Sequence, residues 1–198
     1  MKVAVLACGP SLVRHYTQRE PHDLVIAVNT AGWLYDHDWL AFSDKHIIVE
    51  VKQHETHWPR VGLLTNKAWK SVADQMGRQW VPLPLYHRTL GHLTPEMMDV
   101  CLEGSVTECA YTFPNALWFA RQLGATEVHV YGFDCDPRPE DVAGVRGYHT
   151  RKRWLTELPW IRACWDAATF VPHCAAAPAV LDYVSGRSPR SVLPQLLP

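Results

Sequence analysis

The segment Cys8-Gly9-Pro10-Ser11 directly follows a short apolar run, residues 3–7, which is typical of a buried strand. A glycine at that point lets the backbone approach a ligand closely, and a serine at a helix start offers N–H and O–H donors to a phosphate. The segment is neither G-x-G-x-x-G nor a Walker loop, so the usual dinucleotide and P-loop motifs are missing. A phosphate-binding turn and an ordinary strand–helix turn both remain open.

Polar side chains also follow three later apolar segments. In parallel α/β sheets, ligands bind beyond the carboxyl ends of the strands, so these residues are candidates for contacting a nucleotide or its sugar. The amide of Asn29 can hydrogen-bond a base or a sugar, although a turn explains this residue as well. The candidates in these positions are Asn29 and Thr30, Ser43 and Asp44, and Asp134 with Asp136.

The pair Asp134-x-Asp136 has a further interpretation. Two carboxylates at the end of a strand can hold Mg²⁺ or Mn²⁺ on a nucleotide diphosphate, because these hard cations prefer oxygen ligands. A turn with a helix cap is the alternative. We regard the metal site as the less favoured of the two.

His149 stands at the end of residues 135–149, a stretch rich in proline, glycine and charge with no apolar period. Loops of this length in compact domains are often functional lids. An imidazole titrates near neutral pH, so His149 can serve as a general base. Basic residues cluster around it, with six Lys or Arg against three acids over residues 137–165, and three tryptophans interleaved. A nucleotide or polyanion site and a solvated helix face are both compatible with this pattern.

Strand-like and helix-like segments alternate along the chain, which indicates an α/β fold with a mostly parallel sheet. We expect one nucleotide-binding domain over residues 1–175, with a lid at about 135–149, and a tail over 176–198 that packs on the surface. Strands are expected at 3–7, 24–28, 40–43, 47–51, 81–85, 127–132 and 169–171, and helices at 12–19, 66–76, 95–102, 112–123, 150–168 and 178–184.

Composition supports a single domain with a sizeable core, since the 198 residues are 47% hydrophobic and carry a net charge of -1. No run approaches the ~18 apolar residues of a membrane span, and the first apolar run is too short for a signal peptide. The six cysteines include no C-x-x-C pair, so we expect reduced thiols and a cytoplasmic location. Nine tryptophans suggest a thick aromatic core or a ring-stacking pocket. Trp33 and Trp154 are the best placed to line such a pocket.

Taken together, these landmarks resemble bacterial lipooligosaccharide sialyltransferases. The matching features are the run from Val3 to Leu12, a strand ending in Asn29, a helix–glycine–strand unit ending in Val128-His-Val-Tyr-Gly-Phe-Asp134, and a loop ending in His149. The chain also resembles the related flagellin-glycosylation factors and 6-hydroxymethylpterin pyrophosphokinases, which share the Gly-Pro-Ser-Leu turn. The resemblance implies a single Rossmann-like, GT-A-like domain with a lid.

The sialyltransferase resemblance also implies residue roles. Gly9, Pro10 and Ser11 would line the nucleotide phosphates, and Asn29 would contact the donor. Thr112 stands where those enzymes have a donor-binding serine. His149 falls on their catalytic base, which deprotonates the acceptor hydroxyl. Those enzymes need no metal, and tyrosines in their lid stabilise the leaving phosphate.

Two positions depart from the sialyltransferase pattern. Cys8 replaces an asparagine, and Asp136 replaces a tyrosine that contacts phosphate. Tyr148 or Arg146 would have to fill that role. Both departures weaken a CMP-sialic-acid donor in particular, and the acidic residue suits a metal-dependent diphosphate donor.

The leading expectation is a glycosyltransferase that moves a sugar from a nucleotide sugar to a hydroxyl of a glycan, or of a hydroxymethylated DNA base as in phage modification systems. His149 would be the base. One alternative is a Mg²⁺-dependent pyrophosphokinase acting on a pterin-like hydroxymethyl group. A second alternative is a nucleotide-binding module without catalysis. The oligomeric state stays open.

Overall fold

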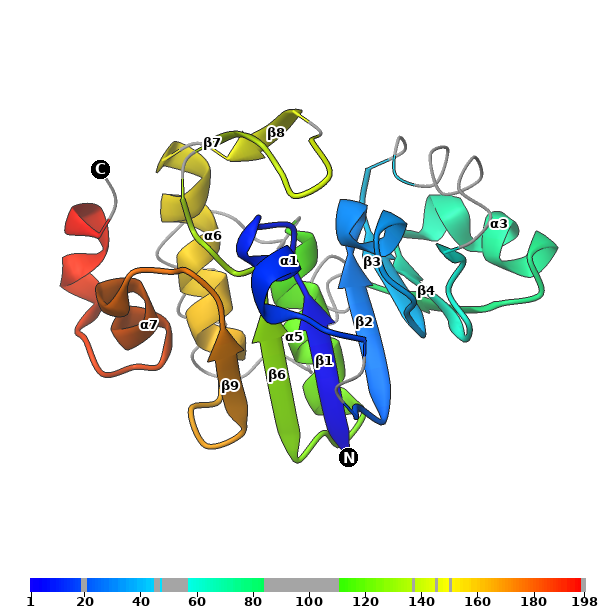
Figure 1. Ribbon diagram of the computed structural model, residues 1–198, viewed down its shortest axis with the longest axis horizontal. Coiled ribbons are helices and arrows are strands. Elements are labelled where there is room, and N and C mark those ends of the chain that lie inside the picture. Colours follow the sequence, from blue (N-terminus) through cyan, green and yellow to red (C-terminus); the bar gives the residue numbers. More distant parts are fainter. Residues whose placement is uncertain are drawn as a thin grey trace.

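Seven parallel strands form the sheet at the centre of the molecule, in the order β5-β4-β3-β2-β1-β6-β9 (Figure 1). The computed structural model describes residues 1–18, 21–44, 47, 57–83, 111–136, 138–144, 146–149 and 151–196. The strands are β1 (Lys2–Leu6), β2 (Leu24–Val28), β3 (Trp39–Phe42), β4 (Gly62–Thr65), β5 (Gln79–Pro82), β6 (Glu127–Tyr131) and β9 (Phe170–His173). Every pairing between neighbours is parallel, which confirms the α/β class with a Rossmann-like sheet.

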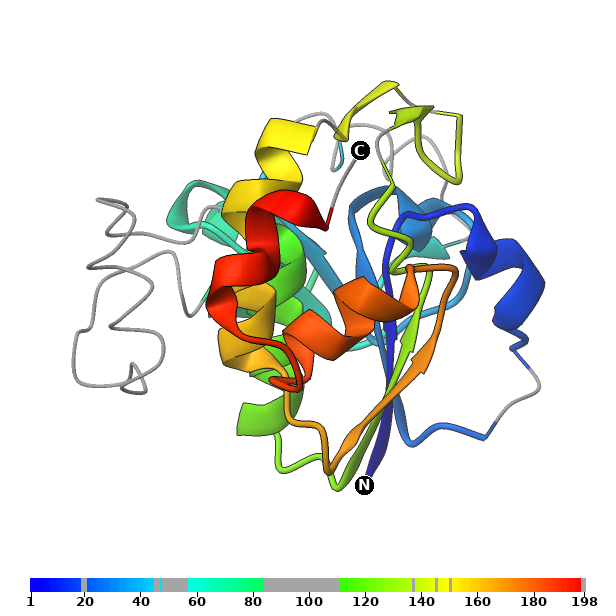
Figure 2. The same cartoon turned by 90° about the vertical axis from the view of Figure 1, so that its left-hand side faces the viewer.

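Helices cover both faces of this sheet. Seen along its edge, the sheet has α5 and α6 on one side and α1 on the other (Figure 2). The helices are α1 (Ser11–His15), α3 (Lys70–Gln75), α5 (Thr112–Gln122), α6 (Arg151–Cys164) and α7 (Pro178–Val184), with 3-10 turns η1 (Asn29–Trp33), η3 (Lys67–Trp69) and η5 (Arg190–Gln195). No helix in the described ranges has the length and apolarity of a membrane-crossing segment.

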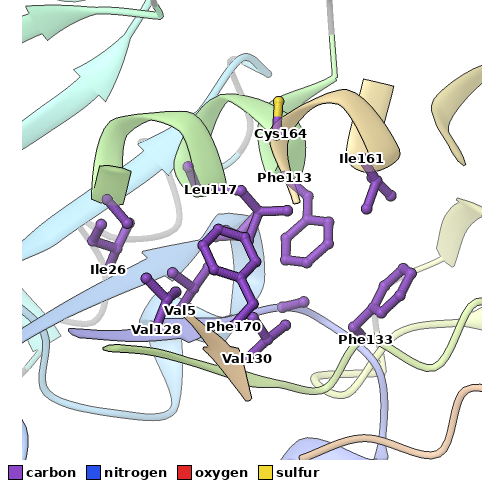
Figure 3. Packing of buried hydrophobic residues seen from close by; sticks show 14 of the residues in the cluster. Val5, Ile26, Phe113, Leu117, Val128, Val130, Phe133, Ile161, Cys164 and Phe170 are labelled. Carbon is purple, nitrogen blue, oxygen red and sulfur yellow. The ribbon is translucent and has the colours of Figure 1, made fainter. Parts of the chain in front are cut away.

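The central strands are buried on both faces, as their continuous apolar runs predict. In β1, Val3 and Val5 face α5 and α6, whereas Ala4 and Leu6 belong to the core on the α1 side. The larger core packs aromatic and aliphatic side chains of α5 and α6 against β1, β2 and β6 (Figure 3). Its rings include the stacked pair Phe113 and Phe133, with centroids 5.3 Å apart. This core holds the first turns of α5 and α6 against the strand ends.

Several elements differ from the sequence-based expectation. The first helix is Ser11–His15 rather than 12–19, and α6 ends at Cys164 rather than at residue 168. The strand β4 was not expected, because its sequence, Gly-Leu-Leu-Thr, has only two apolar residues in a row. Residues 135–149 contain the antiparallel pair β7 (Arg138–Glu140) and β8 (Arg146–His149) rather than an irregular loop. The segment is so polar that these strands show no alternation of apolar residues in the sequence.

Other expected elements match closely or cannot be compared. Asn66 caps the turn that leads into α3, and Gly77 follows this helix with φ +63°, as expected. The bounds of α7 are those predicted. Of the strand expected at 47–51, only Ile47 lies in the described ranges, and it is helical. The helix expected at 95–102 lies outside them.

Two turns touch at the carboxyl edge of the sheet, where β1 lies between β2 and β6 and the strand order reverses. The Gly9 N–H donates to the Gly132 carbonyl over 2.8 Å. A Cβ on Gly9 would lie 2.3 Å from that carbonyl oxygen and 2.5 Å from Oδ2 of Asp134. Gly132 has φ +67°, and its own Cβ would lie 2.6 Å from the Ala7 carbonyl oxygen. Only glycine fits either position, so this contact sets how close β1 and β6 come at the edge.

We expect Gly9→Ala to destabilise the protein by at least about 2 kcal/mol, because backbone atoms must move to admit the methyl group. The matched control is Gly124→Ala, where φ is +76° but nothing lies within 4 Å of the added Cβ. That change should cost about 1 kcal/mol from backbone strain alone. Urea unfolding of both variants measures the difference. Equal costs at the two positions would contradict the close contact.

Candidate functional site

A cavity of about 70 Å³ lies at this carboxyl edge, between the ends of β1, β2 and β6 and the first turns of α5 and α6. This is the topological switch point, where open α/β sheets bind their ligands. Its volume is below the range usual for a whole ligand site, about 300–1,000 Å³, so it has room for only part of a ligand. Seven of the residues singled out in the sequence line it: Cys8, Gly9, Asn29, Thr112, Asp134, Asp136 and Trp154.

The other candidates lie elsewhere. Pro10, Ser11, Thr30, Ser43 and Asp44 are not part of the cavity lining. Asp44 is exposed. The hydroxyl of Ser43 lies 3.3 Å from that of Thr112, so it supports a lining residue from behind.

Three candidates lie on β8, in the segment expected to form a lid, and their side chains are outside the described part of the structure. Arg146, Tyr148 and His149 all belong to β8, whose backbone is described. His149 is the Cα partner of Arg138 in the β7–β8 pair. It directly precedes the segment that enters α6, the helix that forms one wall of the cavity.

Asp134 connects the turn after β6 to the turn after β1. Its carboxylate accepts hydrogen bonds from the Ser11 N–H at 2.9 Å, from the Ser11 hydroxyl, and from the Ala175 N–H at 3.0 Å. Both donors that Ser11 could have offered to a phosphate are therefore taken by Asp134. The same bonds occupy both oxygens that the metal interpretation requires.

The metal interpretation gains nothing from the neighbours of Asp134. Asp136 is exposed at the rim. Within the described ranges, no group of three His, Cys, Asp or Glu side chains is arranged to hold a metal ion. The residues present at this edge do not fit a resident Mg²⁺ or Mn²⁺.

Asn29 has the most unusual environment among the lining residues. Its φ is +48°, one of two positive values at non-glycine residues of the described chain; the other, +51°, is at Cys135, across the same cavity. Its side-chain oxygen Oδ1 is buried and has no hydrogen-bond partner among the described residues. A buried acceptor without a donor costs free energy, so a ligand that donates a hydrogen bond to this oxygen would bind favourably.

The segment after β7 docks on the ends of β1 and β2. The Val142 N–H donates to the Cys8 carbonyl over 2.8 Å, and the Thr30 hydroxyl donates to the Asp141 carboxylate. The Cys8 thiol donates to the Val28 carbonyl at 3.0 Å, and burial raises its pKa to about 11, so it is a neutral donor and not a nucleophile. Cys8 and Thr30 thus hold residues 141–142 in place, and we call these residues the covering segment.

Sequence reasoning missed one charged group in the cavity. Glu157 lies on α6, is buried, and faces the cavity beside Trp154 and Arg153. Burial raises the pKa of Glu157 to about 7, while Arg153, 3.6 Å away, opposes that rise. The spacing of residues 153, 154 and 157 places them on one helix face, so this face was readable once α6 was assigned. Trp154 lines the cavity as expected, whereas Trp33 does not.

The described lining therefore carries three carboxyl groups, Asp134, Asp136 and Glu157, against one guanidinium, Arg153. Phe113, Phe133 and Trp154 supply aromatic surface between them. Such a lining favours a neutral, ring-bearing part of a ligand with hydrogen-bond donors over a bare phosphate.

The raised pKa of Glu157 predicts a pH-dependent stability. Because the folded state holds this proton up to about pH 7 and the unfolded chain releases it near 4.5, the unfolding free energy contributed by Glu157 falls as pH rises through that window. In Glu157→Gln this loss should vanish, and the variant should gain up to about 3 kcal/mol relative to the wild type above the window.

Denaturant unfolding across the pH range measures this difference. The matched control is Asp74→Asn, which breaks an exposed ion pair of the same i,i+4 kind, between Lys70 and Asp74. It should leave the pH profile almost unchanged. A wild type and Glu157→Gln with parallel profiles would rule out a buried, protonated Glu157.

Comparison with solved structures shows where this fold occurs. The structure aligns with the crystal structure of the sialyltransferase CST-II in complex with trisaccharide acceptor and CMP, with a TM-score of 0.56. The alignment covers 96% of this chain and 87% of the other at 13% sequence identity. The sequence itself matches no family model and no curated protein. The chain therefore has a sialyltransferase-like fold, as the resemblance implied, and the comparisons lend no support to the flagellin-glycosylation or pyrophosphokinase families.

Proposed function

We propose that this protein is a glycosyltransferase that moves a sugar from a nucleotide-sugar donor to a hydroxyl acceptor. The observation that carries the proposal is the unpartnered, buried Oδ1 of Asn29 in a cavity at the topological switch point. An amide oxygen there accepts a hydrogen bond from the amino group of a base or from a sugar hydroxyl. The similar solved structure, the sialyltransferase CST-II, is a complex with CMP and a trisaccharide acceptor. CMP carries a base with an amino group, and the trisaccharide carries sugar hydroxyls.

The lining suits the donor in other respects. Aromatic rings of Phe113, Phe133 and Trp154 offer faces for a base or a sugar ring. The Thr112 hydroxyl lies at the start of α5 and can form a hydrogen bond with another oxygen or N–H group of the nucleotide sugar. Because the lining is acidic, the donor phosphates would bind outside this cavity. The basic residues of the stretch 146–153 are the proposed contacts for them.

His149 is the proposed general base. Its imidazole would take the proton of the acceptor hydroxyl as that oxygen bonds to the anomeric carbon. The bond between this carbon and the donor phosphate oxygen would break, and the nucleotide would leave with the electron pair. The covering segment held by Cys8 and Thr30 would exclude water, which limits hydrolysis of the donor. The acceptor is a glycan in this proposal, and a modified DNA base is the second acceptor to test.

The pyrophosphokinase alternative is the weaker one. It requires Asp134 and Asp136 to hold Mg²⁺ together, yet within the described ranges no group of three His, Cys, Asp or Glu side chains is arranged to hold a metal ion. The non-catalytic alternative differs from our proposal only in turnover and is separated by the second experiment below.

The first experiment measures nucleotide binding by thermal shift with CMP, UDP, GDP, ADP and ATP, each with and without Mg²⁺. A ligand that binds only the folded state raises the melting temperature by mass action. We expect one nucleotide to stand out, and Asn29→Gly to weaken it about tenfold, since glycine keeps the positive φ and removes only the amide. The control Asn66→Ala removes an asparagine that caps η3, so it should lower the melting temperature without reducing the ligand shift. No stabilisation by any nucleotide would overturn the proposal.

The second experiment tests the base. With the sugar donor of the preferred nucleotide, His149→Ala should lower turnover by about 10²- to 10⁴-fold and leave nucleotide binding intact. His57→Ala is the control, because His57 pairs with Asp36 away from the cavity. Unchanged turnover in His149→Ala removes this residue from the mechanism, and no turnover in the wild type with any donor supports the non-catalytic module.

A further inference from the structure

A second cavity, of about 510 Å³, lies at the far ends of α5 and α6, bounded by α7 and η5. It shares no lining residue with the cavity at the strand ends. The first turns of α5 and α6 line the first cavity through Thr112 and Arg153, and their last turns line this one through Arg121 and Arg162. Its volume falls within the range of about 300–1,000 Å³ that is usual for small-molecule sites.

The lining of this second cavity is basic. Arg121, Arg162 and Arg190 contribute to it, against the single acid Asp166. The three arginines come from separate elements, α5, α6 and η5, so the fold gathers their charge at one place. Asp166 receives a hydrogen bond from the Ala168 N–H at 3.0 Å, which is a local turn contact.

Two of these guanidinium groups are held in fixed positions. Arg121 Nη1 donates to the Cys164 carbonyl at 3.2 Å, and its guanidinium lies 5.0 Å from the ring centre of Trp118. Arg162 Nη1 donates to the Ser188 carbonyl at 2.7 Å, and its guanidinium lies 4.9 Å from the ring centre of Tyr183. A guanidinium has five N–H donors, so each group keeps donors beyond the one used.

Neither positive charge is neutralised nearby. Within the described ranges, no carboxylate lies within 4.0 Å of Arg121 or Arg162. Both side chains are half-buried, and burial makes a charge without a counterion less favourable. Guanidinium groups held in place beside a cavity of ligand size are therefore suited to bind an anion.

We propose that this cavity is a second binding site, which takes a phosphate-bearing small molecule through Arg121 and Arg162. The planar guanidinium matches the oxygens of a phosphate and can bind it through two parallel hydrogen bonds. Trp165, which also lines the cavity, adds an apolar wall for the rest of the ligand. The phosphate groups can belong to inorganic pyrophosphate or to a free nucleotide. The site stands independently of the glycosyltransferase proposal, because no residue is shared.

The test follows the arginine Nε–Hε signals of ¹⁵N-labelled wild-type protein by NMR during titration with pyrophosphate, AMP or inorganic phosphate. Single substitutions assign the signals of Arg121 and Arg162. We expect both signals to shift and to saturate below millimolar pyrophosphate. A stronger response to AMP identifies a nucleotide as the preferred source, and a response to pyrophosphate alone identifies the phosphates themselves.

Variants then test the assignment by calorimetry with the same probes. Arg121→Gln combined with Arg162→Gln should weaken binding at this site at least about tenfold, as expected for lost charge-assisted hydrogen bonds. Arg187→Gln is the matched control, because Arg187 is exposed and pairs with Asp182 at 2.7 Å, and it should bind as the wild type does. If the double variant does not fold, the wild-type NMR titration decides. Signals of Arg121 and Arg162 that stay unmoved at millimolar concentrations of every probe would overturn the proposal.

Discussion

The turns after β1 and β6 touch at Gly9 and Gly132, and the rest of the candidate site depends on that contact. A side chain on either glycine would overlap backbone atoms of the opposite turn. Asp134 then joins the turns through Ser11. Because the two segments meet this closely, the strand ends, the start of α5 and the first half of α6 enclose one cavity.

The acidic lining of that cavity disfavours the binding of a bare phosphate there. Both donors of Ser11 form hydrogen bonds to the Asp134 carboxylate, which also accepts one from the Ala175 N–H. These donors therefore join the two turns and are not directed at a phosphate. Glu157 and Asp136 add further acidity, which Arg153 offsets in part. A separate group of arginines, Arg121, Arg162 and Arg190, lines the second cavity, which is bounded by α7 and η5. The first cavity is thus mainly acidic and the second mainly basic, and they lie at opposite ends of α5 and α6.

Much of the fold was predictable from local patterns. The buried strands β1, β2, β3 and β6 are continuous apolar runs followed by turn residues, and α5 repeats its apolar positions at helical spacing. The strand β4 was not predicted because it has only two apolar residues in a row, and the β7–β8 pair was not predicted because its strands are polar. Of the candidate site, Asn29 was found by its position after a strand, and Thr112 by the resemblance to sialyltransferases. Glu157 was missed, although its spacing from Trp154 places both on one face of α6, because the sequence does not show which face of this helix lines a cavity.

The amino-acid sequence by itself determined the α/β class, the order of the elements and the set of polar residues that follow the strands. These properties depend on apolar periodicity and on turn-forming residues close together in the chain. The tertiary structure decided which of those residues face the cavity and which bind one another. The Ser11–Asp134 and Thr30–Asp141 hydrogen bonds join residues 123 and 111 positions apart. Such pairings depend on the order of strands in the sheet and on the distance between two turns, which no local pattern of residues encodes.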